Sequence, residues 1–142
     1  MNGRSPLPDT KSPGLRFGPI SAAAHLCVDM QRIFAEDTPW KMPWMLRVLP
    51  LVEMLVGRHP DDTIFTRFIP LQNPDAGVGT WRRYYERWPQ MTLDALDPDL
   101  LELVAPLASF VPPSPVIDKQ VYIVPGTMAT SLACFARPTG TR

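Results

Sequence analysis

Residues 24–31 have the sequence AHLCVDMQ, a short apolar run that ends in the carboxylate of Asp29. An uncharged run of this length is typical of a strand buried on both faces of a parallel sheet. We therefore expect residues 23–29 to form the first strand. A carboxylate there is costly to bury unless it is paired or hydrogen-bonded, so Asp29 is a candidate functional residue. The structural alternative is that Asp29 caps the next segment or accepts backbone N–H groups.

Two later segments also have strand character. Residues 61–69 (DDTIFTRFI) are rich in β-branched and aromatic residues, and residues 116–118 (VID) follow a proline-rich turn. Helical segments separate the three strands. This order predicts an α/β fold, a three-layer Rossmann-like parallel sheet with flanking helices that is incomplete at the C-terminus.

Capping and turn residues set the expected helix ends. Residues 44–57 have helical spacing, and Pro50 is expected to open a second segment at its first turn. Thr80 is expected to cap a helix over residues 81–88. Asp97 is expected to cap a further short helix.

The chain divides into three stretches by composition. Residues 1–22 are expected to be a flexible leader rich in proline and glycine. Residues 23–122 carry the predicted strands and helices. Residues 123–142 form an atypical tail, expected to be irregular.

The overall charge and apolar content exclude several classes of protein. Lys and Arg total 14, as do Asp and Glu, so net charge gives no basis for binding nucleic acid or an anionic membrane. No apolar run approaches the roughly 20 residues of a membrane span. Two cysteines do not make a disulfide framework, and no secretory signal is present, so we expect a cytoplasmic protein.

Three charged residues fall near the ends of the predicted strands. Asp29, Arg67 and Lys119 follow or close their apolar segments. In open α/β sheets, functional groups gather at the carboxyl ends of the strands. We therefore expect these residues at one edge of the sheet, although Lys119 alone is equally consistent with a solvated strand end.

The sequence words LCVDMQ (residues 26–31) and VIDK (residues 116–119) together resemble the isochorismatase-like cysteine hydrolase superfamily. The resemblance covers about residues 23–122 and implies a hydrolase of a small carbonyl, amide or vinyl-ether substrate. It implies that Asp29 is the general base and that Lys119 orients it and stabilises developing negative charge.

The metal ligands and the catalytic cysteine of the family have no counterpart among the matching residues. The resemblance leads us to expect no metal and no cofactor, because the Thr66-Arg67-Phe68 segment lacks the ligands of the metal-binding branch. Cys27, inside a strand, is expected to be an inert small hydrophobe. The resemblance places the family cysteine beyond the matched region, so we expect it to be absent from this chain, and Cys134 is not expected to replace it.

The stretch after Tyr122 departs from the family pattern, and we expect a C-terminal truncation or a change of reading frame there. Two interpretations of the function therefore stay open, and the first is the catalytic one described above. The second is a catalytically inactive remnant or protein-interaction module, with a homo-oligomer formed through the exposed sheet edge.

Residues 81–88 interleave cationic and aromatic side chains. One interpretation is a substrate pocket in which Arg82, like Arg67, contacts the substrate. Another is an amphipathic lid or subunit-contact helix with its four aromatic residues facing inward. Proteins that bind single-stranded nucleic acid use the same residue types, but the zero net charge argues against this function.

Overall fold

Three short parallel strands form the sheet at the centre of the structure. The computed structural model describes residues 23–120, in which β1 is His25–Val28, β2 is Thr63–Phe68 and β3 is Val116–Lys119. The strand order is β1-β2-β3, and both neighbouring pairs are parallel. The predicted α/β class with a Rossmann-like parallel sheet is therefore confirmed.

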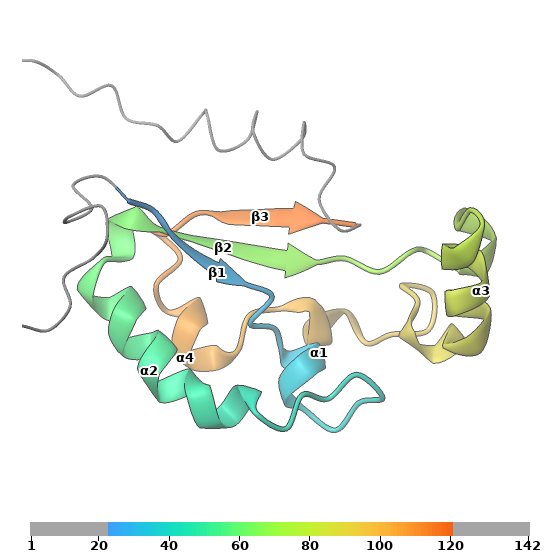
Figure 1. Ribbon diagram of the computed structural model, residues 1–142, viewed down its shortest axis with the longest axis horizontal. Coiled ribbons are helices and arrows are strands. Elements are labelled where there is room, and N and C mark those ends of the chain that lie inside the picture. The colour runs from blue at the N-terminus through green and yellow to red at the C-terminus, as the bar shows by residue number, and fades with distance from the viewer. Residues whose placement is uncertain (1–22, 121–142) are drawn as a thin grey trace, which may run out of the picture.

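Helices occupy the connections between the strands. The α-helices are α1 (Arg32–Ala35), α2 (Met45–Arg58), α3 (Thr80–Arg87) and α4 (Ala105–Ala108). Four 3-10 helices join them, at Pro60–Asp62, Pro74–Ala76, Pro89–Met91 and Pro98–Leu101. Figure 1 shows α1, α2 and α4 over one face of the sheet and α3 beyond the carboxyl ends of the strands.

The sequential strand order explains why these helices share a face. Both crossovers step in the same direction along the sheet, and right-handed crossovers then place their connecting segments on the same side. Cys27 and Phe65 point to that side and join the core with Val56 of α2 and Leu107 of α4.

The prediction that the first strand is buried on both faces is wrong for the part of the chain that the structure describes. Leu26 and Val28 are 38% and 52% exposed, whereas Cys27 between them is 3% exposed. Neighbouring residues on a strand point to opposite faces, and the described helices cover one face.

The prediction for Pro50 is also wrong. α2 continues through this residue from Met45 to Arg58 as one helix. Proline cannot donate the backbone hydrogen bond that position 50 would make to Leu46, but Met45, Leu49 and Val52 pack against the core on both sides of it. Tertiary packing therefore outweighs the local cost of the proline.

The expected caps have different outcomes. Thr80 is the first residue of α3, and Gly79, with a φ of 59°, takes the capping position instead. Asp97 does act as a cap, since its side chain accepts a hydrogen bond from the Asp99 N–H. The short helix that follows it is a 3-10 helix.

The expectations for the leader and the tail, including Cys134, lie outside the described residues. Within residues 23–120, no helix has both the length and the apolar character that a membrane crossing requires.

Candidate active site

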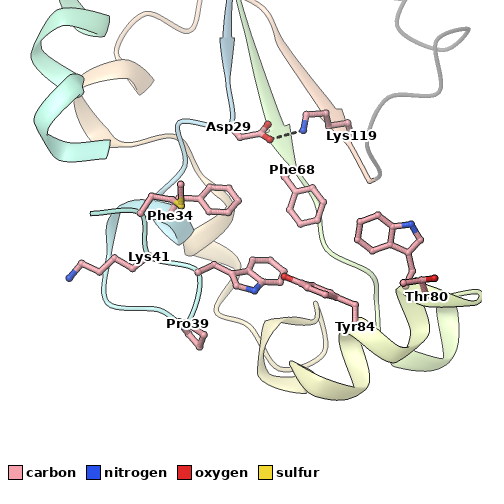
Figure 2. A pocket seen from close by; sticks show the side chains of 11 residues that line it. Asp29, Phe34, Pro39, Lys41, Phe68, Thr80, Tyr84 and Lys119 are labelled. Carbon is pink, nitrogen blue, oxygen red and sulfur yellow. Dashed lines mark hydrogen bonds and ion pairs between the residues drawn. The ribbon is translucent and has the colours of Figure 1, made fainter. Parts of the chain in front are cut away.

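Asp29 and Lys119 meet at the carboxyl edge of the sheet. Asp29 follows β1 and Lys119 ends β3, on either side of β2, and the Lys119 Nζ lies 2.6 Å from the Asp29 Oδ2 (Figure 2). Their side chains are 22% and 16% exposed, so each charge lessens the other's cost of burial. The structure thus brings together the two residues that the sequence singled out first.

Asp29 has an unusual backbone conformation. Its φ of 52° makes it the one non-glycine residue with positive φ within residues 23–120. Its N–H donates to the Thr66 carbonyl at 3.1 Å and to the Thr66 Oγ1 at 3.2 Å. Such a conformation persists only where surrounding contacts hold it.

The two oxygens of the Asp29 carboxylate have different partners. The Thr66 hydroxyl donates to Oδ1 at 2.7 Å, while Lys119 donates to Oδ2. Thr66 is fully buried in β2. The carboxylate is therefore held from two sides by charge-assisted hydrogen bonds.

A pocket of about 570 Å³ opens beside the ion pair. Its walls are largely aromatic, and Figure 2 shows Phe34, Phe68, Tyr84 and the Asp29–Lys119 pair around the same space. The Lys119 ammonium lies 5.7 Å from the centre of the Phe68 ring. The aromatic lining residues are Phe34, Trp40, Phe68, Trp81 and Tyr84.

Gln31 links the strand ends that carry the site. The Gln31 side chain is fully buried, accepts from the Phe68 N–H at 2.7 Å, and donates to the Phe68 and Leu101 carbonyls at 3.0 and 2.8 Å. A buried amide satisfied in this way locks the end of β2 to the segment after β1. It thereby holds the backbone of Phe68, one wall of the pocket.

Arg67 points away from this pocket. Its guanidinium binds Asp118 through two hydrogen bonds of 2.8 and 2.9 Å and Glu102 at 2.8 Å. These partners raise the pKa of Arg67, with the Asp118 hydrogen bond as the largest cause. Successive strand residues alternate in direction, so Thr66 and Phe68 face the site while Arg67 faces the other way. A substrate contact by Arg67 stays a prediction that this geometry does not support.

Arg82 is not at the pocket either. Its guanidinium pairs with Asp75 at 2.8 Å and with Glu86 at 3.2 Å, and the side chain is half exposed. The Asp75 bond joins α3 to the preceding 3-10 helix, whereas the Glu86 bond lies within α3. Its predicted role as a substrate contact likewise has no support from its position.

Some aromatic residues of α3 pack inward and others line the pocket, so each of the two interpretations of residues 81–88 holds for part of the helix. Tyr85 is buried, as packing requires, whereas Trp81 and Tyr84 line the pocket. Tyr84 and Tyr85 each also contact Trp40, with ring centres 6.0 and 6.2 Å apart. α3 therefore serves both as a packed element and as a pocket wall.

The described cysteine is not part of the site. Cys27 is buried on the helix-covered face, and this burial raises its pKa to about 11. Within residues 23–120, no group of three or more His, Cys, Asp or Glu side chains is arranged to hold a metal ion.

Sequence reasoning missed five of the residues described above, Gln31, Phe34, Trp40, Thr66 and Phe68. Thr66 and Phe68 could have been found from strand alternation, because they share the direction opposite to Arg67. Gln31 lay in the quoted LCVDMQ word but had no assigned role. Phe34 and Trp40 lie between the first predicted strand and the first predicted helix, and no local pattern links them to the site.

The comparisons with known proteins point to one fold. A crystal structure described as a cysteine hydrolase from Pseudomonas syringae pv. phaseolicola 1448A matches with a TM-score of 0.60 and 24% sequence identity. The match covers 80% of this chain and 54% of that one, so this chain spans about half the length of its structural neighbour. No protein-family model and no curated protein matches the chain. At this identity the likeness establishes a shared fold, that of a Rossmann-like α/β protein.

Proposed function

We propose that the chain belongs to the isochorismatase-like hydrolases and acts on a small carbonyl, amide or vinyl-ether substrate. The observation that carries the proposal is the partly buried Asp29–Lys119 pair at the wall of an aromatic pocket. The fold shared with a protein described as a cysteine hydrolase supports it.

In the proposed reaction Asp29 is the general base. It accepts the proton of the attacking nucleophile as that nucleophile bonds to the electrophilic carbon of the substrate, and it returns the proton to the leaving group. Lys119 holds the carboxylate by its 2.6 Å hydrogen bond and supplies positive charge beside the developing negative charge.

In this proposal the nucleophile is not one of the described side chains. The buried Cys27, whose pKa is raised to about 11, is a thiol rather than a thiolate near neutral pH and does not line the pocket. We propose a water molecule in this role, or the family cysteine in a version of the chain whose reading frame is restored after codon 122.

The pocket favours a flat and mostly apolar substrate body. Aromatic walls contribute to binding by burying apolar area and by stacking against planar groups. A cavity of about 570 Å³ is within the range of sites for small molecules. The reacting group would then lie at the Asp29 and Lys119 end.

The test is a hydrolase assay on primary amides, carbamoyl compounds and vinyl ethers that carry a flat apolar group. Asp29→Asn should lower kcat/KM by about 10²- to 10⁴-fold, because it removes the base. Asp118→Asn is the matched control, since Asp118 lies beside Lys119 on β3 and binds Arg67 on the other face. Its activity should stay near that of the unchanged chain.

The assay is run on the 142-residue chain beside a version read in the other frames after codon 122, since the predicted frame change stays a prediction. Activity of the 142-residue chain that survives Asp29→Asn would contradict the assignment of Asp29 as the general base.

A second candidate function, a non-catalytic interaction module, is favoured by one observation. One exposed side of α2 carries Val48, Leu51 and Leu55, and Trp44, just before the helix, continues this stripe, so that the spacings are four, three and four residues. This is the spacing with which a helix packs against a second helix.

A further inference from the structure

We infer that Thr66 is a positioning residue that fixes the direction of the Asp29 carboxylate, an inference that rests on the proposed role of Asp29 as base. Thr66 touches no other group in the pocket that the proposed reaction uses. Its hydroxyl acts through Asp29, which it contacts at two points, and the Thr66 carbonyl separately accepts from the Asp29 N–H at 3.1 Å.

The two contacts involve one hydroxyl group. The Thr66 Oγ1 accepts from the Asp29 N–H at 3.2 Å and donates its proton to the Asp29 Oδ1 at 2.7 Å. The backbone and the side chain of Asp29 are thus tied to the same buried atom. This arrangement helps to hold the positive φ of 52° that turns Asp29 toward Lys119.

Lys119 alone would not set the carboxylate direction. Its ammonium is a compact charge on a flexible stem and can pair with either oxygen. Because Thr66 occupies Oδ1, Lys119 is left with Oδ2. The remaining lone pairs of the carboxylate then have a defined direction relative to the pocket.

A second threonine on the same strand provides a matched control. Thr63 is as fully buried as Thr66, and its hydroxyl donates to the His59 carbonyl at 2.7 Å. It lies at the opposite end of β2 from the site. A loss of function that only reflects a missing buried hydroxyl should be the same at both positions.

The kinetic test compares Thr66→Val, Thr66→Ser and Thr63→Val with the unchanged chain on the best substrate of the assay. Thr66→Val should lower kcat by about 10- to 100-fold with KM nearly unchanged, because it misdirects the base without altering the pocket walls. Thr66→Ser should restore kcat, and Thr63→Val should leave it unchanged at a comparable loss of thermal stability. Equal effects of the two valine variants on kcat would overturn the inference.

A second measurement does not depend on activity. The Asp29 N–H keeps its 3.1 Å bond to the Thr66 carbonyl in every variant, so its exchange reports how firmly the hydroxyl holds the turn. Amide hydrogen exchange at Asp29, measured against the Phe65 amide as internal reference, should accelerate about fivefold or more in Thr66→Val and stay unchanged in Thr66→Ser. If the unchanged chain hydrolyses nothing but Asp29 exchange follows this pattern, the proposed function fails while Thr66 still positions Asp29. If exchange at Asp29 is the same in all variants, the positioning role is overturned whatever the activity.

Discussion

Cys27 and Asp29 stand two positions apart in the chain and have different surroundings. Cys27 lies in the core between the sheet and its helices, and no cationic group within residues 23–120 favours its thiolate. Asp29 lies past the last residue of β1, where the turn of its backbone directs the carboxylate to Lys119. Cys27, within the strand, is therefore a packing residue, whereas Asp29, just past the strand end, is a candidate catalytic residue.

The buried thiol of Cys27 should react slowly with alkylating reagents. In a Cys134→Ser background at pH 8, we expect iodoacetamide to modify the native chain about 100-fold more slowly than the unfolded chain, because burial raises the pKa to about 11. Mass spectrometry over time measures this rate. A native rate equal to that in guanidinium would contradict the burial of Cys27.

The same shift predicts a pH dependence of stability. The folded-state pKa of Cys27 lies above its ordinary value of 9.0, so its contribution is fully present below pH 9. The contribution is lost as the pH rises through about 11. Denaturant melts at pH 8 and pH 10.5 should show this loss, and it should be smaller in Cys27→Ala, in which burial still raises the pKa of Tyr85.

At the scale of the element, α2 shows packing overriding a local signal. Pro50 predicts a break, yet one helix runs from Met45 to Arg58 because Met45, Leu49, Val52 and Val56 all contact the core. The spacing of these four residues is that of one helix face. Core contacts on both sides of residue 50 therefore keep the helix whole where the local signal predicts a break.

Replacing this proline should stabilise the protein. Pro50→Ala restores a backbone donor to the Leu46 carbonyl, so we expect a gain of about 1–2 kcal/mol after the greater freedom of the unfolded chain is subtracted. Thermal and denaturant melts measure it. Pro43→Ala, just before the helix, is the control and should bring no gain. Destabilisation by Pro50→Ala would mean that the proline ring itself packs favourably.

At the scale of the whole molecule, the described residues leave apolar surface on two sides. One is the sheet face that carries Leu26 and Val28, and the other is the outer stripe of α2. The sequence-based expectation of a homo-oligomer invoked the sheet edge. The α2 stripe is a second surface through which two copies could pair.

We predict that any self-association depends on this stripe. Leu51→Gln should lower the mass that light scattering measures at high protein concentration, because Leu51 lies in the middle of the stripe. Leu46→Gln is the control, since Leu46 is equally exposed at 56% against 57% but lies on another side of the helix. A single monomeric mass for the unchanged chain at all concentrations would count against the interaction module.

The sequence by itself determined the α/β class, the three strands and the two charged residues Asp29 and Lys119. Apolar runs and their ends are local signals, and parallel strands necessarily bring their carboxyl ends to one edge. The α/β order and that edge follow from chain order alone. The expected strand ends differ from the observed ones by only a few residues.

Only the tertiary structure decided which side chains share the site. Arg67 and Thr66 are neighbours in sequence, yet alternation sends one to Asp118 and the other to Asp29. Three features of the site depend on residues far apart in the chain. Thr66 holds the positive φ of Asp29, Gln31 bonds to Phe68, and Trp40 packs against α3. These contacts depend on how the strands pair and the helices pack, which local sequence patterns do not encode.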